Sequence, residues 1–567
     1  SMPLTYEAVT RRSFLGAASL AGARFYVNKP IIARGSMNKP ESSTIPIVTS
    51  HFDCVVVGGT PGGIAAAVTA ARLGRSVVLV EYHPTLGGMS ASGLGKSDIE
   101  NRSLICGLFS EFTDRVRKYY IKRYGINSEN VRLCHDGYYY EPSVAESIFN
   151  QLINEQGLIT VLNNHQFEST LKRNQKATGV VVIDRKLGIR RKLLAPILID
   201  ATYEGDVYAG AGAKYRLGRE SRDEFGEPHA GTIYFDYRKG IFLQGSTGEG
   251  DNRLPAYTYR LCLTTSASNA YPLRKPPANY DPSHYIGYFE DLQQGRLAGP
   301  KSFKPGRGYY PEHFNTLVRA LSVTDSPNQK TDVNMNPRPL GFPFAEENEG
   351  YVEGSWEARE KISINIRNLT LGLLWFLQQE STVGEEHRKI ARAYHLPKDE
   401  FTGTNHFPHQ LYIREARRLV GLYILTEHDV TRNSKRTNAG HFNDAVALGE
   451  FPIDSFPVRK RQPSDSAVLE GYLYMLENTQ SYQIPYRIMI PVKVDGLIVP
   501  VAASTTHVAF SSIRMEPTWM ALGQAAGVAA HLALEQKIQP RNVDIKQLQK
   551  ILLQQNQVLD LNRRFSS

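Results

Sequence analysis

Six consecutive residues have the types and spacing that bind a pyrophosphate. Residues 58–63 read Gly-Gly-Thr-Pro-Gly-Gly and follow the apolar run Cys-Val-Val-Val. Gly58 and Gly63 take the first and last positions of a G-x-G-x-x-G pattern, with Thr60 in the middle position. The first glycine permits a tight strand-to-helix turn, and the helix N-terminus offers free N–H groups to phosphate oxygens. The pattern predicts a dinucleotide site made by Gly58, Gly59, Thr60, Pro61, Gly62 and Gly63.

An acid at a suitable distance supports this site. Glu81 ends a second apolar run, Ser-Val-Val-Leu-Val-Glu over 76–81. A carboxylate at that point can accept hydrogen bonds from ribose hydroxyls. The alternative is a purely structural glycine turn. The strand before the turn, the helix after it and the acid beyond favour dinucleotide binding.

A second glycine-rich loop, Leu-Gly-Gly-Met-Ser-Ala-Ser-Gly-Leu-Gly, follows over 86–95. Such a loop lets backbone approach a bulky planar ligand, and nicotinamide enzymes usually lack it. It resembles the Gly-Gly loop of the glutathione-reductase-like FAD proteins, where the loop lies along the pyrophosphate and ribityl chain. The resemblance implies cofactor contacts at Gly87, Gly88 and Met89.

Blocks further along the chain extend the resemblance. Residues 199–202, Ile-Asp-Ala-Thr, are similar to a strand end of these flavoproteins, with Tyr203 where glycine is usual. Residues 511–527 resemble their last helix, whose N-terminus points at the flavin. The implied contacts here are Ala201, Thr202, Gly523, Ala525 and Ala526.

The ordered blocks from about 52 to 555 resemble the secreted FAD-dependent oxidoreductases often named xanthan-lyase-like. They include Gly-Leu-Gly-Lys-Ser-Asp at 93–98, Asp-Ala-Thr-Tyr-Glu-Gly-Asp at 200–206, Tyr-Ile-Arg-Glu-Ala-Arg-Arg at 412–418 and Ser-Ile-Arg-Met-Glu-Pro at 512–517. The resemblance implies FAD as cofactor. We expect non-covalent binding because no clear His or Cys attachment signature is present. A second cofactor, NAD(P), is not expected because only one complete fingerprint occurs.

Three residues are candidates for the chemistry. His507 precedes the helix implied to face the flavin, and an imidazole can accept the proton of an oxidised hydroxyl near neutral pH; the alternative is a histidine bonded to backbone. Asp98 is a second candidate base, or a turn or flavin contact. Arg414 shares a predicted helix face with Arg418, and the two could clamp a carboxylate. Structural ion pairing with Glu415 is the alternative.

Metal and disulfide chemistry have weaker support. His406 and His409 could form a metal pair, but no clear third ligand accompanies them, and we expect no metal. The four cysteines, Cys54, Cys106, Cys134 and Cys262, contain no Cys-x-x-Cys pair, so a zinc site or iron–sulfur cluster is not expected. At most one disulfide is predicted.

The elements that must position these residues follow from periodicity. Short apolar runs at 53–58, 76–81 and 198–201 predict buried parallel strands. Helices are predicted over 64–73, 141–156, 356–380, 411–425, 516–535 and 544–556, and strands over 159–162, 179–184, 488–492 and 497–501. The implied fold is α/β, a Rossmann-like FAD-binding domain split in sequence with an inserted mixed α+β substrate domain. The predicted divisions are 1–50 (signal and linker), 51–206 (FAD domain, first part), 207–483 (insertion) and 484–567 (return segment and C-terminal helix).

Composition and the N-terminus bear on compartment and partners. The 567 residues carry a net charge of +10, but the basic residues are scattered, which argues against nucleic-acid binding. Residues 10–16, Thr-Arg-Arg-Ser-Phe-Leu-Gly, and the Ala-Gly-Ala at 21–23 resemble a bacterial twin-arginine export signal. The apolar run at 14–23 is too short to span a bilayer, so no stable membrane insertion is expected. We expect a periplasmic or secreted protein.

Three functions remain open. The first is an exported FAD-dependent oxidoreductase that dehydrogenates a hydroxyl of a sugar, polyol or sugar acid. Aromatic residues such as Tyr257, Tyr259, Tyr285, Tyr288, Tyr309 and Tyr310 suit carbohydrate stacking, although tyrosine also serves cores. The second is an FAD-using, redox-neutral lyase or isomerase acting on a carbohydrate, and the third a non-catalytic flavin-binding protein. The substrate is expected to be a small molecule or oligosaccharide; the sequence leaves the electron acceptor and the oligomeric state open.

Overall fold

The computed structural model describes residues 47–562 apart from 238, 286–322, 336–341, 433 and 463–467. The predicted export signal lies outside the described residues, as do Tyr288, Tyr309 and Tyr310. No helix in the described part of the chain is long and apolar enough to cross a bilayer.

A five-stranded parallel sheet forms the base of the fold. Its order is β22 (Leu497–Ile498), β8 (Ile197–Asp200), β2 (Cys54–Val57), β3 (Val77–Val80) and β4 (Ile159–Leu162). Alternate residues of β2 enter different cores, Cys54 and Val56 on one face and Val55 and Val57 on the other. The strand is therefore buried on both faces, which explains its continuous apolar run.

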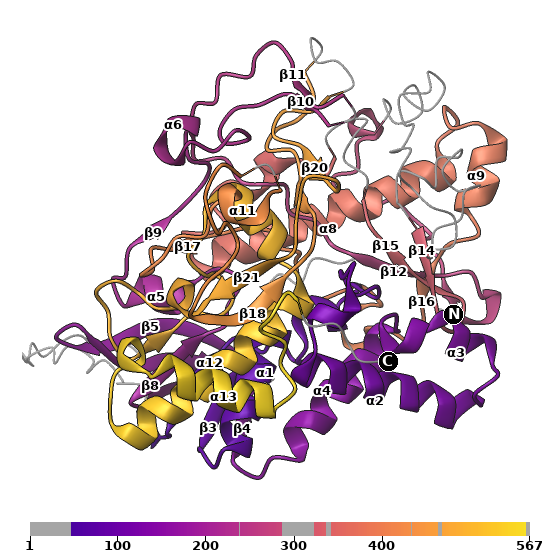
Figure 1. Cartoon of the computed structure of the whole chain (residues 1–567). Coiled ribbons are helices and arrows are strands. Elements are labelled where there is room, and N and C mark those ends of the chain that lie inside the picture. The colour runs from indigo at the N-terminus through magenta and orange to yellow at the C-terminus, as the bar shows by residue number, and fades with distance from the viewer. Residues whose placement is uncertain are drawn as a thin grey trace, which may run out of the picture.

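Helix α1 (Pro61–Arg72) packs closely against α12 (Glu516–Gln536), and Figure 1 shows α12 beside α1, with α13 (Ile545–Gln554), in yellow, next to α12. Glycine at position 523 makes this close approach possible, because a Cβ there would lie 2.0 Å from the Gly62 carbonyl oxygen. The small residues of the two helices thus allow backbone to touch backbone. A segment near the C-terminus is thereby fixed on the glycine-rich turn.

Further elements cover this base. A second sheet has the order β1 (Ile47–His51), β7 (Arg190–Leu194), β6 (Lys176–Asp184) and β5 (His165–Arg173), and three helices complete this region, α2 (Gly107–Tyr124), α3 (Glu129–Leu133) and α4 (Pro142–Asn154). Between β8 and β22 the longest helix is α8 (Trp356–Gln379), drawn in salmon in Figure 1. The other α-helices among the described residues there are α5 (Asp206–Gly210), α6 (Arg222–Phe225), α9 (Glu385–Ala391) and α10 (Glu427–Val430).

The same region holds one three-stranded and five two-stranded sheets among the described residues. The larger has the order β12 (Leu261–Thr264), β15 (Lys330–Val333) and β14 (Val323–Ser326). The pairs are β9 (Tyr215–Arg216) with β17 (Arg418–Leu419), β10 (Phe235–Asp236) with β11 (Ile241–Phe242), β13 (Ala270–Tyr271) with β16 (Leu396–Pro397), β18 (Ala445–Gly449) with β21 (Tyr482–Pro485) and β19 (Ile453–Ser455) with β20 (Leu473–Met475). The mixed α/β character agrees with the sequence; the domain divisions at 206 and 483 stay a prediction.

Two predicted elements are wrong. Residues 411–425 do not form a helix: the N–H of Tyr412 donates to Thr258, and that of Leu419 to Ala502, so the backbone pairs with distant segments. Arg414 and Arg418 are both buried, unlike the charged residues on the solvent face of a surface helix. Residues 488–492 do not form a strand, because 486–489 make a short 3₁₀ turn.

Three of the tyrosines expected to suit carbohydrate stacking are buried, and the cysteines form no disulfide. Tyr257, Tyr259 and Tyr285 are all buried. All four cysteines are free thiols, and burial raises the pKa of Cys54 and Cys262. Tyr257, Tyr285, Cys54, Cys134 and Cys262 belong to the packing of the fold, whereas Tyr259 also lines the pocket described below.

The glycine contact between α1 and α12 can be tested. Gly523→Ala is expected to destabilise the protein by about 1–3 kcal/mol, because the new methyl group collides with backbone that cannot rotate away. Thermal unfolding measures the effect. Gly157→Ala is the matched control, since nothing lies within 4 Å of its added Cβ. Equal melting temperatures for both variants would contradict the close packing.

Candidate active site

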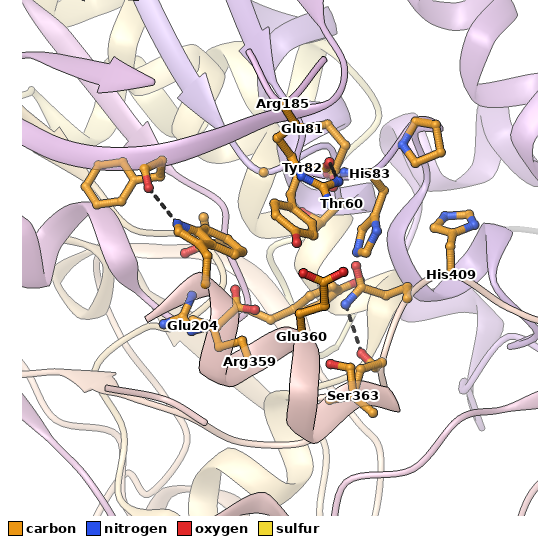
Figure 2. A pocket seen from close by; sticks show the side chains of 18 of the residues that line it. Thr60, Glu81, Tyr82, His83, Arg185, Glu204, Arg359, Glu360, Ser363 and His409 are labelled. Carbon is orange, nitrogen blue, oxygen red and sulfur yellow. Dashed lines mark hydrogen bonds between the residues drawn. The ribbon is translucent and has the colours of Figure 1, made fainter. Parts of the chain in front are cut away.

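A pocket of about 340 Å³ opens at the carboxyl ends of β2, β3 and β8. Figure 2 shows Thr60, Glu81 and His83 on one wall, with Glu360 and Ser363 of α8 facing them. Ligands of open α/β sheets bind at this edge of the sheet, where successive connections run to opposite sides. The predicted pyrophosphate turn and the predicted ribose acid therefore line one pocket.

The glycine turn has no room for side chains. Gly58 has a φ of +106°, and a Cβ there would lie 2.5 Å from the Ala201 carbonyl oxygen. Thr60 is the N-cap of α1: its hydroxyl accepts from the N–H of Gly63 at 3.1 Å and donates to the Ala201 carbonyl at 2.9 Å. Pro61 occupies the first turn, where no backbone N–H is required. The turn is thus held against the end of β8 through the Ala201 carbonyl. A cofactor contact at Ala201 stays a prediction.

Glu81 is fixed by backbone donors. One carboxylate oxygen accepts from the N–H of Gly59 at 2.7 Å and the other from the N–H of His83 at 2.9 Å. Burial raises the pKa of Glu81 to about 7. Both bonds orient the carboxylate at the pocket wall, where it can meet a hydroxyl donor.

An aromatic pair lines the pocket beside Glu81. The rings of Tyr82 and Trp356 stack with centroids 4.3 Å apart, and the indole N–H donates to the Phe167 carbonyl at 2.8 Å. The Arg185 guanidinium lies 3.8 Å from the Tyr82 ring centroid. Trp356 and Arg185 thus both pack on the Tyr82 ring, and the three side chains form part of the pocket wall. Sequence patterns predicted the helix that carries Trp356, but no signal in them indicated that it faces this pocket.

The second glycine loop packs on the first. The N–H of Gly87 donates to the Gly59 carbonyl at 2.8 Å, and Gly87 and Gly88 have φ of +114° and +50°. The Tyr203 hydroxyl accepts from the N–H of Met89 at 3.0 Å and donates to a Glu516 oxygen at 2.7 Å. Tyr203, the departure from the flavoprotein pattern, therefore links this loop to the start of α12.

The remaining predicted cofactor residues have structural contacts. The Thr202 hydroxyl donates to Asp200 and accepts from the N–H of Gly205, and Thr202 lines the pocket. Gly523, Ala525 and Ala526 are on α12, which packs against α1, and do not line the pocket. Cofactor contacts at these three stay a prediction.

The two histidines of the predicted metal pair have different surroundings. His409 lines the pocket and contacts the hydroxyl groups of Thr85 at 2.8 Å and Ser92 at 3.1 Å. Burial lowers its pKa to about 4, so the ring is neutral at pH 7. His406 contacts the Glu400 carbonyl. Within the described ranges no three His, Cys, Asp or Glu residues gather as metal ligands.

His507 is the first residue of α11 (His507–Ile513), and a carboxylate orients its ring. Its Nδ1 lies 2.7 Å from a Glu415 oxygen, and its backbone N–H donates to Glu220 at 2.9 Å. Arg418 pairs with both of these glutamates, which holds the three groups together. Because Nδ1 is bonded to Glu415, proton transfer by this buried ring would use Nε2. No local pattern in the sequence indicated that Glu415 orients His507.

Asp98 and Arg414 share electrostatic neighbours. Burial raises the pKa of Asp98, and Arg260 and Arg514 nearby oppose that rise. Burial lowers the pKa of Arg414, and the same two arginines lower it further. The clamp predicted between Arg414 and Arg418 does not form, because Arg418 is engaged with Glu220 and Glu415. Neither Asp98, Arg414 nor His507 lines the pocket described above.

Comparison with known proteins identifies the class. Residues 53–552 match the sequence model of the family described as FAD dependent oxidoreductase. A tRNA uridine 5-carboxymethylaminomethyl modification enzyme from Dichelobacter nodosus is 27% identical over 234 residues, 37% of this chain and 35% of that protein. A mitochondrial dihydrolipoyl dehydrogenase from Dictyostelium discoideum is 36% identical over 80 residues, 14% of this chain and 16% of that protein. The chain thus spans about a third or less of the length of these relatives.

A solved structure, a geranylgeranyl bacteriochlorophyll reductase-like protein from Thermoplasma acidophilum, overlaps 89% of this chain and 84% of its own, with 12% identity and a TM-score of 0.33. The match over 53–552 shows that the chain belongs to the FAD-dependent oxidoreductases. It is an enzyme, and its cofactor is FAD.

The residues of the pocket fit FAD. The turn at 58–63 leads into the N-terminus of α1, where free N–H groups can meet phosphate oxygens, and Glu81 presents an oriented carboxylate in the same pocket. Those residues would hold the adenosine and pyrophosphate parts of the cofactor.

Removal of the Glu81 carboxylate tests this assignment. Glu81→Ala is expected to weaken FAD binding roughly 10- to 100-fold, since hydrogen bonds to charged groups contribute about 1.5–3 kcal/mol. The ratio of flavin to protein and the Kd of the reconstituted apoprotein are the measurements. Glu111→Ala, which removes a surface acid paired with Arg72, is the control and should retain FAD. Unchanged FAD affinity in Glu81→Ala would contradict the site.

A pH dependence follows from Glu516. Burial raises its pKa from 4.5 to about 8, so the folded protein holds this proton more tightly than the unfolded chain. The associated stability is present below pH 4.5 and is lost as the pH rises towards 8. Glu516→Gln stays neutral and keeps an acceptor for Tyr203. The variant should therefore gain roughly 2 kcal/mol or more over wild type between pH 5 and pH 9, seen as diverging melting temperatures. Parallel melting curves across this range would refute the assignment.

Proposed function

We propose that the protein is an exported FAD-dependent dehydrogenase that oxidises a hydroxyl group of a sugar, polyol or sugar acid. The single observation that carries a dehydrogenase role is the pair of His507 and Glu415, at 2.7 Å. A buried imidazole with one nitrogen bonded to a carboxylate is oriented and stabilised as a proton acceptor. The substrate class follows from the family resemblance, and the export from the paired arginines at 11–12 with the Ala-Gly-Ala at 21–23.

The proposed reaction removes one proton and one hydride from the alcohol. The Nε2 of His507 accepts the hydroxyl proton while the carbon loses a hydride, so the alcohol becomes a carbonyl and His507 becomes an imidazolium. Bound FAD supplies the acceptor for the hydride at N5. Glu415 stabilises the imidazolium charge, and Arg418 keeps Glu415 in place. An external acceptor, either O₂, a quinone or a protein, must then remove the electrons.

Anaerobic reduction of the flavin tests the proposed function. The purified holoenzyme is mixed without oxygen with sugars, polyols, sugar acids, amines and hydroxy acids, and absorbance near ~450 nm is followed. Lasting bleaching by a sugar, polyol or sugar acid is the expected result. Product formed with no acceptor consumed would instead favour a redox-neutral lyase or isomerase. No bleaching and no product across the panel would contradict enzymatic oxidation of these classes.

Substitution of the base follows once a reducing substrate is in hand. His507→Asn is expected to lower the rate of flavin reduction about 10²- to 10⁴-fold, the usual contribution of a positioned base. Glu415→Gln should lower the rate of flavin reduction less and change its pH profile, because Glu415 orients His507 but does not accept the proton. Both variants must retain FAD. A reduction rate within twofold of wild type for His507→Asn would refute the role of His507.

A further inference from the structure

Arg414 is a buried cation without a carboxylate partner in the described part of the chain. Its side chain is 1% exposed. Nη1 donates to the Ala256 carbonyl at 2.8 Å, while Nε and Nη2 have no hydrogen-bond partner among the described residues. Burial lowers its pKa to about 9, so the guanidinium remains charged at neutral pH.

Neighbouring buried arginines have carboxylate partners by contrast. Arg418 pairs with Glu220 and Glu415, Arg417 pairs with Asp206 at 2.9 Å, and Arg260 pairs with Asp332 at 2.6 Å. Each of these three arginines thus has a carboxylate partner inside the fold. Arg414 departs from this pattern within the same seven-residue block at 412–418.

The surroundings of Arg414 hold a guanidinium but do not neutralise it. Its central carbon lies 3.7 Å from the Phe456 ring centroid and 4.2 Å from that of Tyr412. Two further cations, Arg260 and Arg514, lie close enough to lower its pKa, and Asp454 acts in the opposite direction. Arg514 is itself engaged with the Tyr412 hydroxyl and the Asp454 carbonyl. Aromatic faces attract the cation but cannot accept its in-plane N–H bonds.

The two unsatisfied nitrogens define the missing partner. Nε and Nη2 form one edge of the planar guanidinium, and their N–H bonds run parallel. A carboxylate matches this edge with two oxygens and returns a negative charge to a buried cation. Without such a partner, only the Ala256 carbonyl and the two aromatic faces offset the desolvation of Arg414.

We propose that Arg414 binds a carboxylate group of the substrate, so that the enzyme acts on a sugar acid or another hydroxy acid. The inference rests on the proposed function and narrows it. The residue after Arg414 is Glu415, which orients His507, so one short segment carries both the anchor for the carboxylate and the support for the base.

Binding of acids and their neutral counterparts tests the proposal. The probes are D-glucuronate against its methyl ester, D-gluconate against D-sorbitol, and glycolate against glycolamide, titrated calorimetrically into the oxidised holoenzyme. At least one acid should bind wild type tenfold or more tightly than its counterpart. Arg414→Met should lose that preference, while Arg487→Met, a change at a partly exposed arginine paired with Asp444, should keep it. Absence of any preference for an acid in wild type, or its persistence in Arg414→Met, overturns the proposal.

Thermal unfolding without added acid separates a binding residue from a structural one. Arg414→Met should melt no lower than wild type, because it removes an unpaired buried charge. Arg418→Met should melt several degrees lower, because it leaves two buried glutamates without their cation. A comparable loss in both variants overturns the proposal. Loss of FAD from Arg414→Met also overturns it, since the free edge would then contact the cofactor.

The two proposals fail in different ways. If an acid binds through Arg414 but nothing reduces the flavin, the carboxylate site stands and the dehydrogenase function fails. If a neutral alcohol reduces the flavin equally well in wild type and Arg414→Met, and no acid is preferred, the dehydrogenase function stands and the carboxylate site fails.

Discussion

The packing of backbone against backbone at the glycine-rich turn is the constraint on which this structure depends. The turn at 58–63 lies against β8, and its helix lies against α12, because glycines at Gly58, Gly62 and Gly523 leave no side chain in the way. β8 and α12 are more than 300 residues apart in the chain, yet both pack against this one feature. Glu81 and the loop at 86–95 then attach to the same turn through hydrogen bonds to Gly59.

The proposed chemistry depends on a second, polar kind of packing. Arg418 pairs with Glu415 and Glu220, which in turn bind the side chain and the backbone of His507. Buried ion pairs of this kind add little net stability, because desolvation offsets their attraction. They do specify geometry, since each group has few alternative partners in the interior. The fold thus uses apolar and glycine contacts for stability and a charge network for position.

Local patterns in the sequence predicted the local parts of the site. The turn at 58–63, the acid Glu81 and the flanking strand and helix are encoded within about thirty residues, and the structure forms them as predicted. The segment at 411–425 failed because its conformation is set by partners far away, such as Glu220 for Arg418, 198 residues distant. His507 and Glu415 are 92 residues apart, so nothing in either neighbourhood revealed their contact. The same holds for Trp356, whose helix was predicted but whose place at the pocket was not.

A crystal structure of the purified holoenzyme with its FAD would test the central claim most directly. The account predicts the pyrophosphate at the N-terminus of α1, the ribose of the adenosine at Glu81, and the reactive edge of the flavin on the side of the molecule that carries His507 and Arg414. A dinucleotide bound away from the turn at 58–63, or a flavin edge remote from His507, would contradict it.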